Sequence, residues 1–180
     1  MSVKAVPILK TKRLLLRGLI DADKKYLLLM RSDPQGNRYI ERALAKDMSD
    51  IDAHLEKINL GAALGENTYW ILQKKENPEL MGNICFWNFS PDRTVAELGY
   101  QMRTEFQRHG YMDEALKAVL QYGFEILHLK EIEAFTQFEN MASIELLLKN
   151  GFELQEDRRD QGFPKNRIYI ISHKKYFSPQ

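Results

Sequence analysis

The segment from Tyr111 to Leu127 constrains the fold more than any other part of the chain. Its apolar residues recur at helical spacing, and its charged and amide side chains fall on the opposite face. The apolar set is Met112, Ala115, Leu116, Val119, Leu120, Gly123 and Leu127. Strand patterns lie on both sides of this segment, at 94–102 and 131–137. We therefore predict an amphipathic helix between two strands, packed against the sheet to which they belong.

Helical spacing predicts three more helices, over residues 21–30, 47–60 and 140–150. The carboxylates of Asp21 and Asp23 suit the start of the first, because side-chain oxygens there accept hydrogen bonds from unpaired N–H groups. Gly61, together with Gly65, is predicted to end the second helix, and Gly151 closes the third.

Short apolar runs bounded by turn residues predict the strands. They are 13–17, 68–73, 80–89, 94–102, 131–137, 152–156 and 167–173. Turns at Asn77-Pro78 and Ser90-Pro91-Asp92 separate the second, third and fourth of these strands, which read as an antiparallel meander. The sequence thus predicts one α/β domain over residues 1–180, with a mixed central sheet of six to seven strands and about four helices on its two sides.

The charges are balanced, with 26 Lys and Arg against 25 Asp and Glu and no run of five like charges. This balance argues against a nucleic-acid or membrane-surface partner. No apolar stretch approaches the ~20 residues of a membrane-spanning helix. The start lacks a secretory signal and Cys85 is the single cysteine, so we expect a cytoplasmic protein. The four histidines lack metal-ligand spacing, so we expect no metal, and the sequence leaves monomer and homodimer open.

The loop from Gln107 to Met112 lies between a predicted strand and the amphipathic helix. Unpaired N–H groups at the positive end of a helix form a site for phosphate, and Gly110 permits close approach of the backbone. A plain strand-to-helix turn uses glycine for steric reasons at least as often. The loop alone therefore leaves both interpretations open.

The wider pattern resembles the GNAT superfamily of acetyltransferases. Gln107 and Gly110 stand at the first and fourth positions of its pyrophosphate-binding pattern, and Met112 departs from the small residue at the sixth. The strand Ala96-Glu97-Leu98-Gly99-Tyr100 looks like the one that runs alongside the pantetheine arm. Further segments resemble the branch of ribosomal-protein N-terminal acetyltransferases. They are 9–17, 109–115, 140–144 and 149–152.

The resemblance implies a GNAT fold, acetyl-CoA as cosubstrate and an amine as acceptor. Main-chain N–H groups around Leu98 to Met102 would hold the thioester oxygen, and Asn140 would cap its helix and reach the pantetheine. The implied cofactor-binding residues are Leu98, Tyr100, Met102, Gln107, Arg108, His109, Gly110, Tyr111, Met112, Asn140 and Ser143.

Transfer of an acetyl group to an amine requires a base for the amine and an acid for the departing thiolate. The resemblance points to Glu97 as the base, and an ion pair with a neighbouring strand is the alternative. Many relatives carry a tyrosine acid where this chain has Leu147. Ser143 stands where the ribosomal-protein branch has its suspected substitute, and helix capping is the alternative.

The acceptor stays open between a protein N-terminal α-amino group and a small molecule such as a polyamine, an amino acid or an antibiotic. The segments 31–48 and 158–166 are expected to decide between them. A third possibility, of another class, is an acetyl-CoA-binding sensor or interaction module without catalysis.

Overall fold

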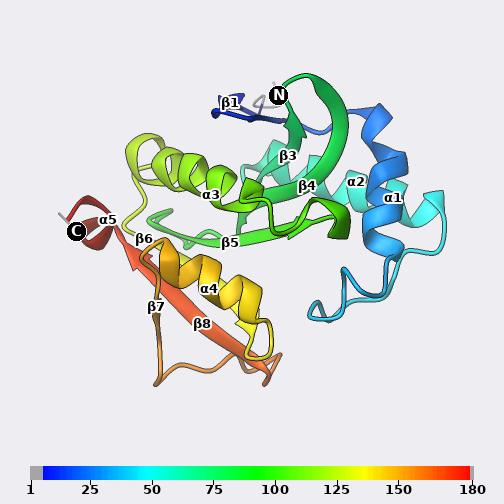
Figure 1. Ribbon diagram of the computed structural model, residues 1–180. Coiled ribbons are helices and arrows are strands. Elements are labelled where there is room, and N and C mark those ends of the chain that lie inside the picture. The colour runs from blue at the N-terminus through cyan, green and yellow to red at the C-terminus, as the bar shows by residue number, and fades with distance from the viewer. Residues whose placement is uncertain (1–5, 179–180) are drawn as a thin grey trace.

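A computed structural model describes residues 6–178, so the two ends of the expected 1–180 domain lie outside the described residues. The core is an eight-stranded sheet of order β1-β2-β3-β4-β5-β6-β8-β7 (Figure 1). The strands are β1 (Leu9–Lys10), β2 (Leu14–Arg17), β3 (Thr68–Lys74), β4 (Asn77–Trp87), β5 (Val95–Met102), β6 (Glu131–Gln137), β7 (Glu153–Leu154) and β8 (Asn166–Ser172). All neighbouring strands are antiparallel except β5 and β6, which are parallel.

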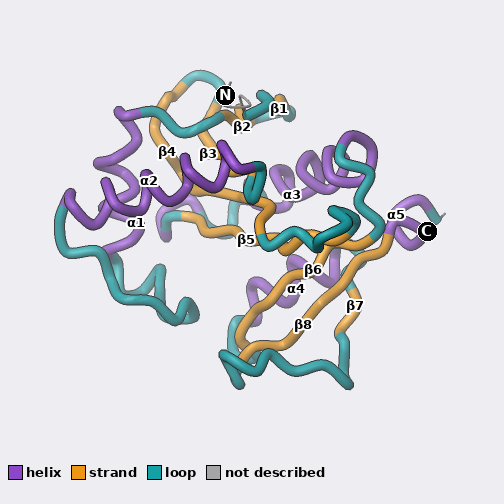
Figure 2. Tube along the Cα trace, turned by 180° about the vertical axis from the view of Figure 1, so that it is seen from behind, coloured by secondary structure: helices purple, strands orange, loops and turns teal. Residues whose placement is uncertain are grey.

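Helices cover both faces of the sheet (Figures 1 and 2). They are α1 (Lys24–Ser32), α2 (Met48–Leu64), α3 (Tyr111–Gln121), α4 (Met141–Lys149) and α5 (His173–Phe177). Successive residues of β3 point to opposite faces. Tyr69 and Ile71 pack in the cluster formed with α1 and α2, whereas Trp70 and Leu72 pack in the cluster that contains α3 and α4. The sheet therefore has a hydrophobic core on each side.

The predicted mixed α/β sheet and the antiparallel meander of β3, β4 and β5 are confirmed. The sheet has eight strands rather than six to seven, because β1 spans only two residues and leaves no periodic signal. The five-residue α5 was missed for the same reason. The third predicted strand ends at Trp87, two residues before Phe89, because Asn88 has a left-handed φ of 48° that breaks the extended backbone.

Of the two glycines predicted to end the second helix, Gly65 is confirmed and Gly61 is wrong. Helix α2 continues through Gly61 to Leu64, and Gly65, with φ 73°, is its left-handed C-cap. Gly61 serves a packing need instead, because a side chain there would collide with Asn67, whose amide donates to Ile58 O at 3.1 Å. No helix of residues 6–178 is long and apolar enough to cross a membrane.

Candidate active site

Strands β5 and β6 separate part of the way along their length. The parallel ladder pairs Val95 with Glu131 and ends where Leu98 pairs with Ala134. Beyond this point β5 continues to Met102 paired with β4, and β6 continues to Gln137 paired with β8. The facing edges of the two strands are therefore free of each other, which leaves main-chain N–H and C=O groups for a ligand between them.

The loop after β5 leads into the N-terminus of α3. Gly110 is the N-cap residue, with φ 74°, and Arg108 also has a positive φ of 62°. The first hydrogen bond of the helix runs from Glu114 N to Gly110 O at 3.2 Å. The N–H groups of Tyr111, Met112 and Asp113 therefore have no acceptor within the helix. Gly110 is exposed, so this end of the helix faces solvent.

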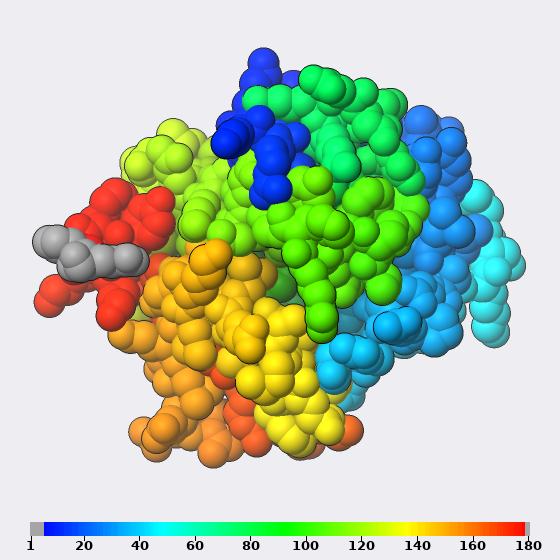
Figure 3. Space-filling view, viewed as in Figure 1, coloured from blue at the N-terminus to red at the C-terminus, as the bar shows by residue number. Residues whose placement is uncertain are grey.

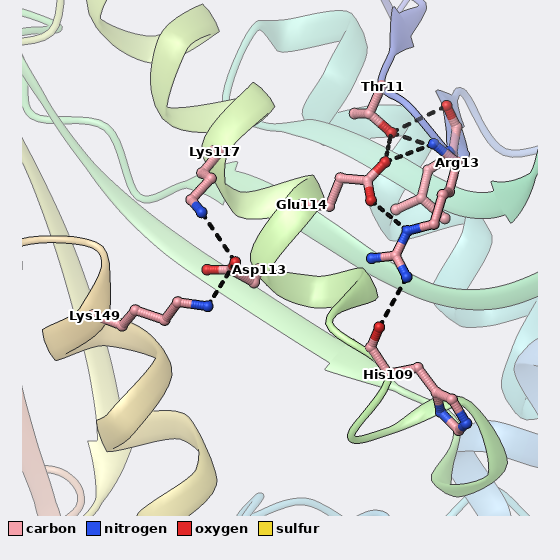
Figure 4. Close-up of polar contacts among 8 residues, drawn as sticks. Thr11, Arg13, His109, Asp113, Glu114, Lys117 and Lys149 are labelled. Atoms are coloured by element: carbon pink, nitrogen blue, oxygen red, sulfur yellow. Dashed lines mark hydrogen bonds and ion pairs between the residues drawn. The ribbon is translucent and has the colours of Figure 1, made fainter.

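An arginine from the start of the sheet braces the same turn (Figure 4). Arg13 Nε donates to Glu114 Oε2 at 2.6 Å, and Arg13 Nη1 donates to His109 O at 3.0 Å. The guanidinium also lies 4.5 Å from the centre of the Tyr111 ring. Arg13 thus ties the turn to the first turn of the helix, with its charge paired to Glu114, and the free N–H groups of the helix N-terminus are the part of this turn that favours an anion.

Ser143 and Tyr100 meet where β5 and β6 diverge. Tyr100 OH and Ser143 Oγ are 2.7 Å apart, and burial raises the pKa of Tyr100 to about 12 although the bond with Ser143 acts to lower it. Asn140 Oδ1 accepts from Ser143 N at 3.3 Å and caps α4. The Ser143 hydroxyl is therefore engaged with Tyr100, and Asn140 does the capping.

Glu97 lies on the opposite face of β5 from Tyr100. Its register partners are Trp87 and Glu133, so the alternative of an ion pair with a basic residue on a neighbouring strand does not form. Burial, with smaller contributions from the charges of Glu133 and Asp160, raises the pKa of Glu97 to about 7, against the opposing effect of a hydrogen bond from Asn88 Nδ2 at 3.3 Å. A carboxyl group with such a pKa exchanges protons near neutral pH.

The remaining predicted residues divide into buried residues of β5 and exposed residues of the loop before α3. Leu98 and Met102 are buried, so their side chains pack in the core and only their main chain borders the opening. Gln107 Nε2 donates to Met102 O at 2.9 Å and ties the loop to the end of β5. Arg108 and His109 are exposed at the turn. Leu147 is fully buried, as expected of a core residue without an acid role.

Two features escaped the sequence analysis. The bracing of the α3 turn by Arg13 joins residues 101 positions apart, and the hydroxyl contact of Tyr100 joins residues 43 apart, so neither has a local signal. Cys85 is half-buried, and burial raises the pKa of its thiol to about 12. Figure 3 shows a hollow where the loop before α3, the start of α4 and the segment between α1 and α2 meet.

Comparisons with known proteins agree with this geometry. Residues 13–153 match the family model of the acetyltransferase (GNAT) domain. The uncharacterized N-acetyltransferase YoaA of Bacillus subtilis is 33% identical over 150 residues, which cover 82% of this chain and 83% of that protein.

Two solved structures share the fold. RimL, a ribosomal α-N-protein acetyltransferase, superimposes with a TM-score of 0.78 at 18% identity over 96% of both chains. A spermidine N-acetyltransferase from Vibrio cholerae, in complex with CoA and spermine, also gives a TM-score of 0.78 at 18% identity, over 92% of this chain and 98% of its own. The match over most of the chain, on a sheet that opens beside a helix N-terminus, shows that the protein belongs to the GNAT family and is an acetyl-CoA-dependent N-acetyltransferase.

Proposed function

We propose that this enzyme acetylates a protein N-terminal α-amino group by direct attack on the thioester of acetyl-CoA. The observation that carries the proposal is the opening between β5 and β6, flanked by Glu97 on one face of β5 and by the Tyr100–Ser143 pair on the other. A base and an acid on opposite sides of one opening suit a reaction in which the amine enters from one side and the thiolate leaves on the other.

The cosubstrate fits the residues present. The N–H groups of Tyr111, Met112 and Asp113 would bind the diphosphate, and Arg13, which is paired with Glu114, would hold the turn in place. Main-chain groups of β5 beyond Leu98 would bind the pantetheine arm and the thioester oxygen. No described residue accepts a hydrogen bond from Asn140 Nδ2, so this amide remains available for the pantetheine as well.

The proton transfers follow from these positions. Glu97 accepts the proton that the amine loses as its nitrogen bonds to the acetyl carbon, and its raised pKa matches this task at neutral pH. The carbon–sulfur bond breaks, and the Ser143 hydroxyl donates the proton that the sulfur needs, with Tyr100 as its hydrogen-bond partner. No acyl-enzyme is involved, in keeping with the high pKa of Cys85.

The N-terminal acceptor is supported by the segments that resemble the ribosomal-protein branch, and the fold likeness to RimL is compatible with it. The equal likeness to a spermidine acetyltransferase keeps a small-molecule amine as the second candidate. The test is CoA release with a panel of N-terminal peptides, polyamines, amino acids and aminoglycosides. We expect peptides to give the highest kcat/KM, whereas turnover with polyamines alone would reject the N-terminal assignment, and acetyl-CoA binding without any turnover would favour a sensor.

A further inference from the structure

Two arginines lie near the end of β5 that carries Gln101, and neither forms an ion pair with a described carboxylate, although the charge of Asp50 acts on one of them, Arg31. Arg31 lies in the last turn of α1, and Arg42 lies in the segment that leads from α1 to α2. Arg42 Nη2 donates to Gln101 Oε1 at 2.6 Å and also to Asn37 Oδ1, while Arg31 Nη1 lies 3.3 Å from His54 Nε2. All of these partners are uncharged, because burial and the nearby arginines lower the pKa of His54 to about 4.

The two guanidinium groups are incompletely satisfied. Their Nε atoms are buried and find no acceptor among residues 6–178, and neither group forms an ion pair with a carboxylate in that range. Burial, followed by the charge of Arg31, lowers the pKa of Arg42 to about 10, and burial also lowers that of Arg31. Two positive charges held close together in a partly buried site raise the free energy of the folded protein unless an anion binds between them.

Their place along β5 relates them to the reacting amine. Gln101, which Arg42 contacts, lies on the same face of the strand as Glu97, four residues or about 13 Å away. Gly99 stands between them and presents no side chain. The Glu97 end carries the carboxyl groups of Glu97, Glu133 and Asp160, of which Glu133 forms an ion pair with Arg158 at 2.6 Å. The Gln101 end carries the two arginines. This face therefore has an end with an excess of acidic groups and an end with an excess of basic groups.

We propose that Arg31 and Arg42 form a carboxylate subsite for the acceptor. The acceptor is an amine with a carboxylate several bonds away, such as a peptide N-terminus with an acidic side chain close to it. This inference rests on the proposed function, because it takes the Glu97 end as the place of the amine. Guanidinium groups match the two oxygens of a carboxylate, and the same groups repel the second ammonium of a polyamine.

The test compares pairs of acceptors in which one member carries a carboxylate and the other does not. Peptides with Glu or Gln at the second position form one pair, and aminohexanoate and diaminohexane form another. The pair that shows the preference tells whether the natural acceptor is a peptide or a free aminocarboxylate. If the natural acceptor is a peptide, we expect the wild-type kcat/KM to be about 100-fold higher for the Glu peptide than for the Gln peptide. If it is a free aminocarboxylate, we expect the same preference for aminohexanoate over diaminohexane. In Arg42→Met and Arg31→Met this preference falls to below about 5-fold, through KM for the acceptor, with KM for acetyl-CoA unchanged. Arg38→Met is the matched control, because Arg38 is exposed on the same segment and packs on Tyr39.

The outcomes separate the two proposals. Equal turnover of the two members of each pair by the wild type overturns the subsite but leaves the acetyltransferase assignment intact. If no acceptor is turned over, calorimetry with glutarate tests the subsite directly. Binding that is lost in Arg42→Met and kept in Arg38→Met supports it, and binding that is absent or equal in all variants overturns it. Thermal unfolding of each variant identifies any that fails to fold, and the comparison of acceptors in the wild type does not depend on the variants.

Discussion

The hydroxyl oxygens of Tyr100 and Ser143 lie 2.7 Å apart, which joins β5 to the first turn of α4 across the opening in the sheet. Neither hydroxyl titrates near neutral pH by itself, and burial raises the pKa of Tyr100 to about 12. Such a pair can still pass a proton to a thiolate, because the sulfur becomes basic as the carbon–sulfur bond breaks.

Ser143→Ala should lower kcat by about 100-fold, the lower end of what a positioned acid contributes, with KM for acetyl-CoA nearly unchanged. Tyr100→Phe should have a smaller effect, because the Ser143 hydroxyl remains. Steady-state kinetics measures both, and Tyr122→Phe is the control, since that ring packs against Trp70 in the core. Full turnover by Ser143→Ala would show that Ser143 is not the acid that protonates the thiolate.

Glu97→Gln should abolish the rise of kcat/KM with pH that the wild type shows through about pH 7. Only the ionised carboxylate accepts a proton, and it is the major form above its pKa. A pH–rate profile of both proteins gives the answer, and identical profiles would exclude Glu97 as the base.

The same raised pKa makes a prediction for stability. Between pH 4.5, the ordinary pKa of a glutamate, and about pH 7, the folded protein binds more protons at Glu97 than the unfolded chain does. The free energy of unfolding should therefore fall, relative to Glu97→Gln, as the pH rises through this window. Urea denaturation at several pH values measures the difference, and a wild type that gains stability relative to the variant would contradict the raised pKa.

Gly110→Ala should weaken acetyl-CoA binding by more than its effect on stability explains. Both Gly110 and Gly65 have left-handed φ values, 74° and 73°, so an alanine at either costs about 1 kcal/mol of folding free energy. Only Gly110 borders the free N–H groups of α3. Calorimetric titration should show about a 10-fold weaker affinity for Gly110→Ala and no change for Gly65→Ala, and equal affinities would place the diphosphate elsewhere.

Asp113→Asn should loosen the contact between α3 and α4. Lys117 and Lys149 each contact Asp113 Oδ2, at 3.0 and 2.9 Å (Figure 4), and Asn150 Nδ2 donates to Oδ1 at 2.8 Å. Partial burial acts to raise the pKa of Asp113, but these bonds prevail and lower it to about 2.

This contribution is present above the ordinary pKa of about 3.9 and is lost as the pH falls toward 2. Thermal unfolding at pH 7 should show a loss of about 1 kcal/mol for Asp113→Asn, near the net contribution of one ordinary hydrogen bond. The exposed Asp157→Asn is the control. A difference between wild type and Asp113→Asn that is as large at pH 2 as at pH 7 would contradict this account.

The parts of the site that depend on local pattern could be predicted, and the parts that depend on distant contacts could not. The helical spacing of apolar residues predicted α3, and the glycine at position 110 predicted the turn that leads into it. The strand around Glu97 was evident, but its neighbour Glu133 comes from a parallel strand whose register has no sequence signal. Arg31 and Arg42 look like ordinary surface charges in the sequence, and only the packing of the α1–α2 segment against Gln101 buries their Nε atoms.

The short ladder between β5 and β6 has a mechanical consequence. Hydrogen-bonded continuity from β1 to β7 depends on the four residue pairs between Val95 and Leu98. This ladder joins a five-stranded part of the sheet, β1 to β5, to a three-stranded part, β6 to β7. A hinge motion of the two parts relative to each other would therefore occur at these four residue pairs. A molecule seated in the gap would act as a missing strand and stiffen that hinge, and slower exchange of the amide hydrogens of 99–102 and 135–137 would report it.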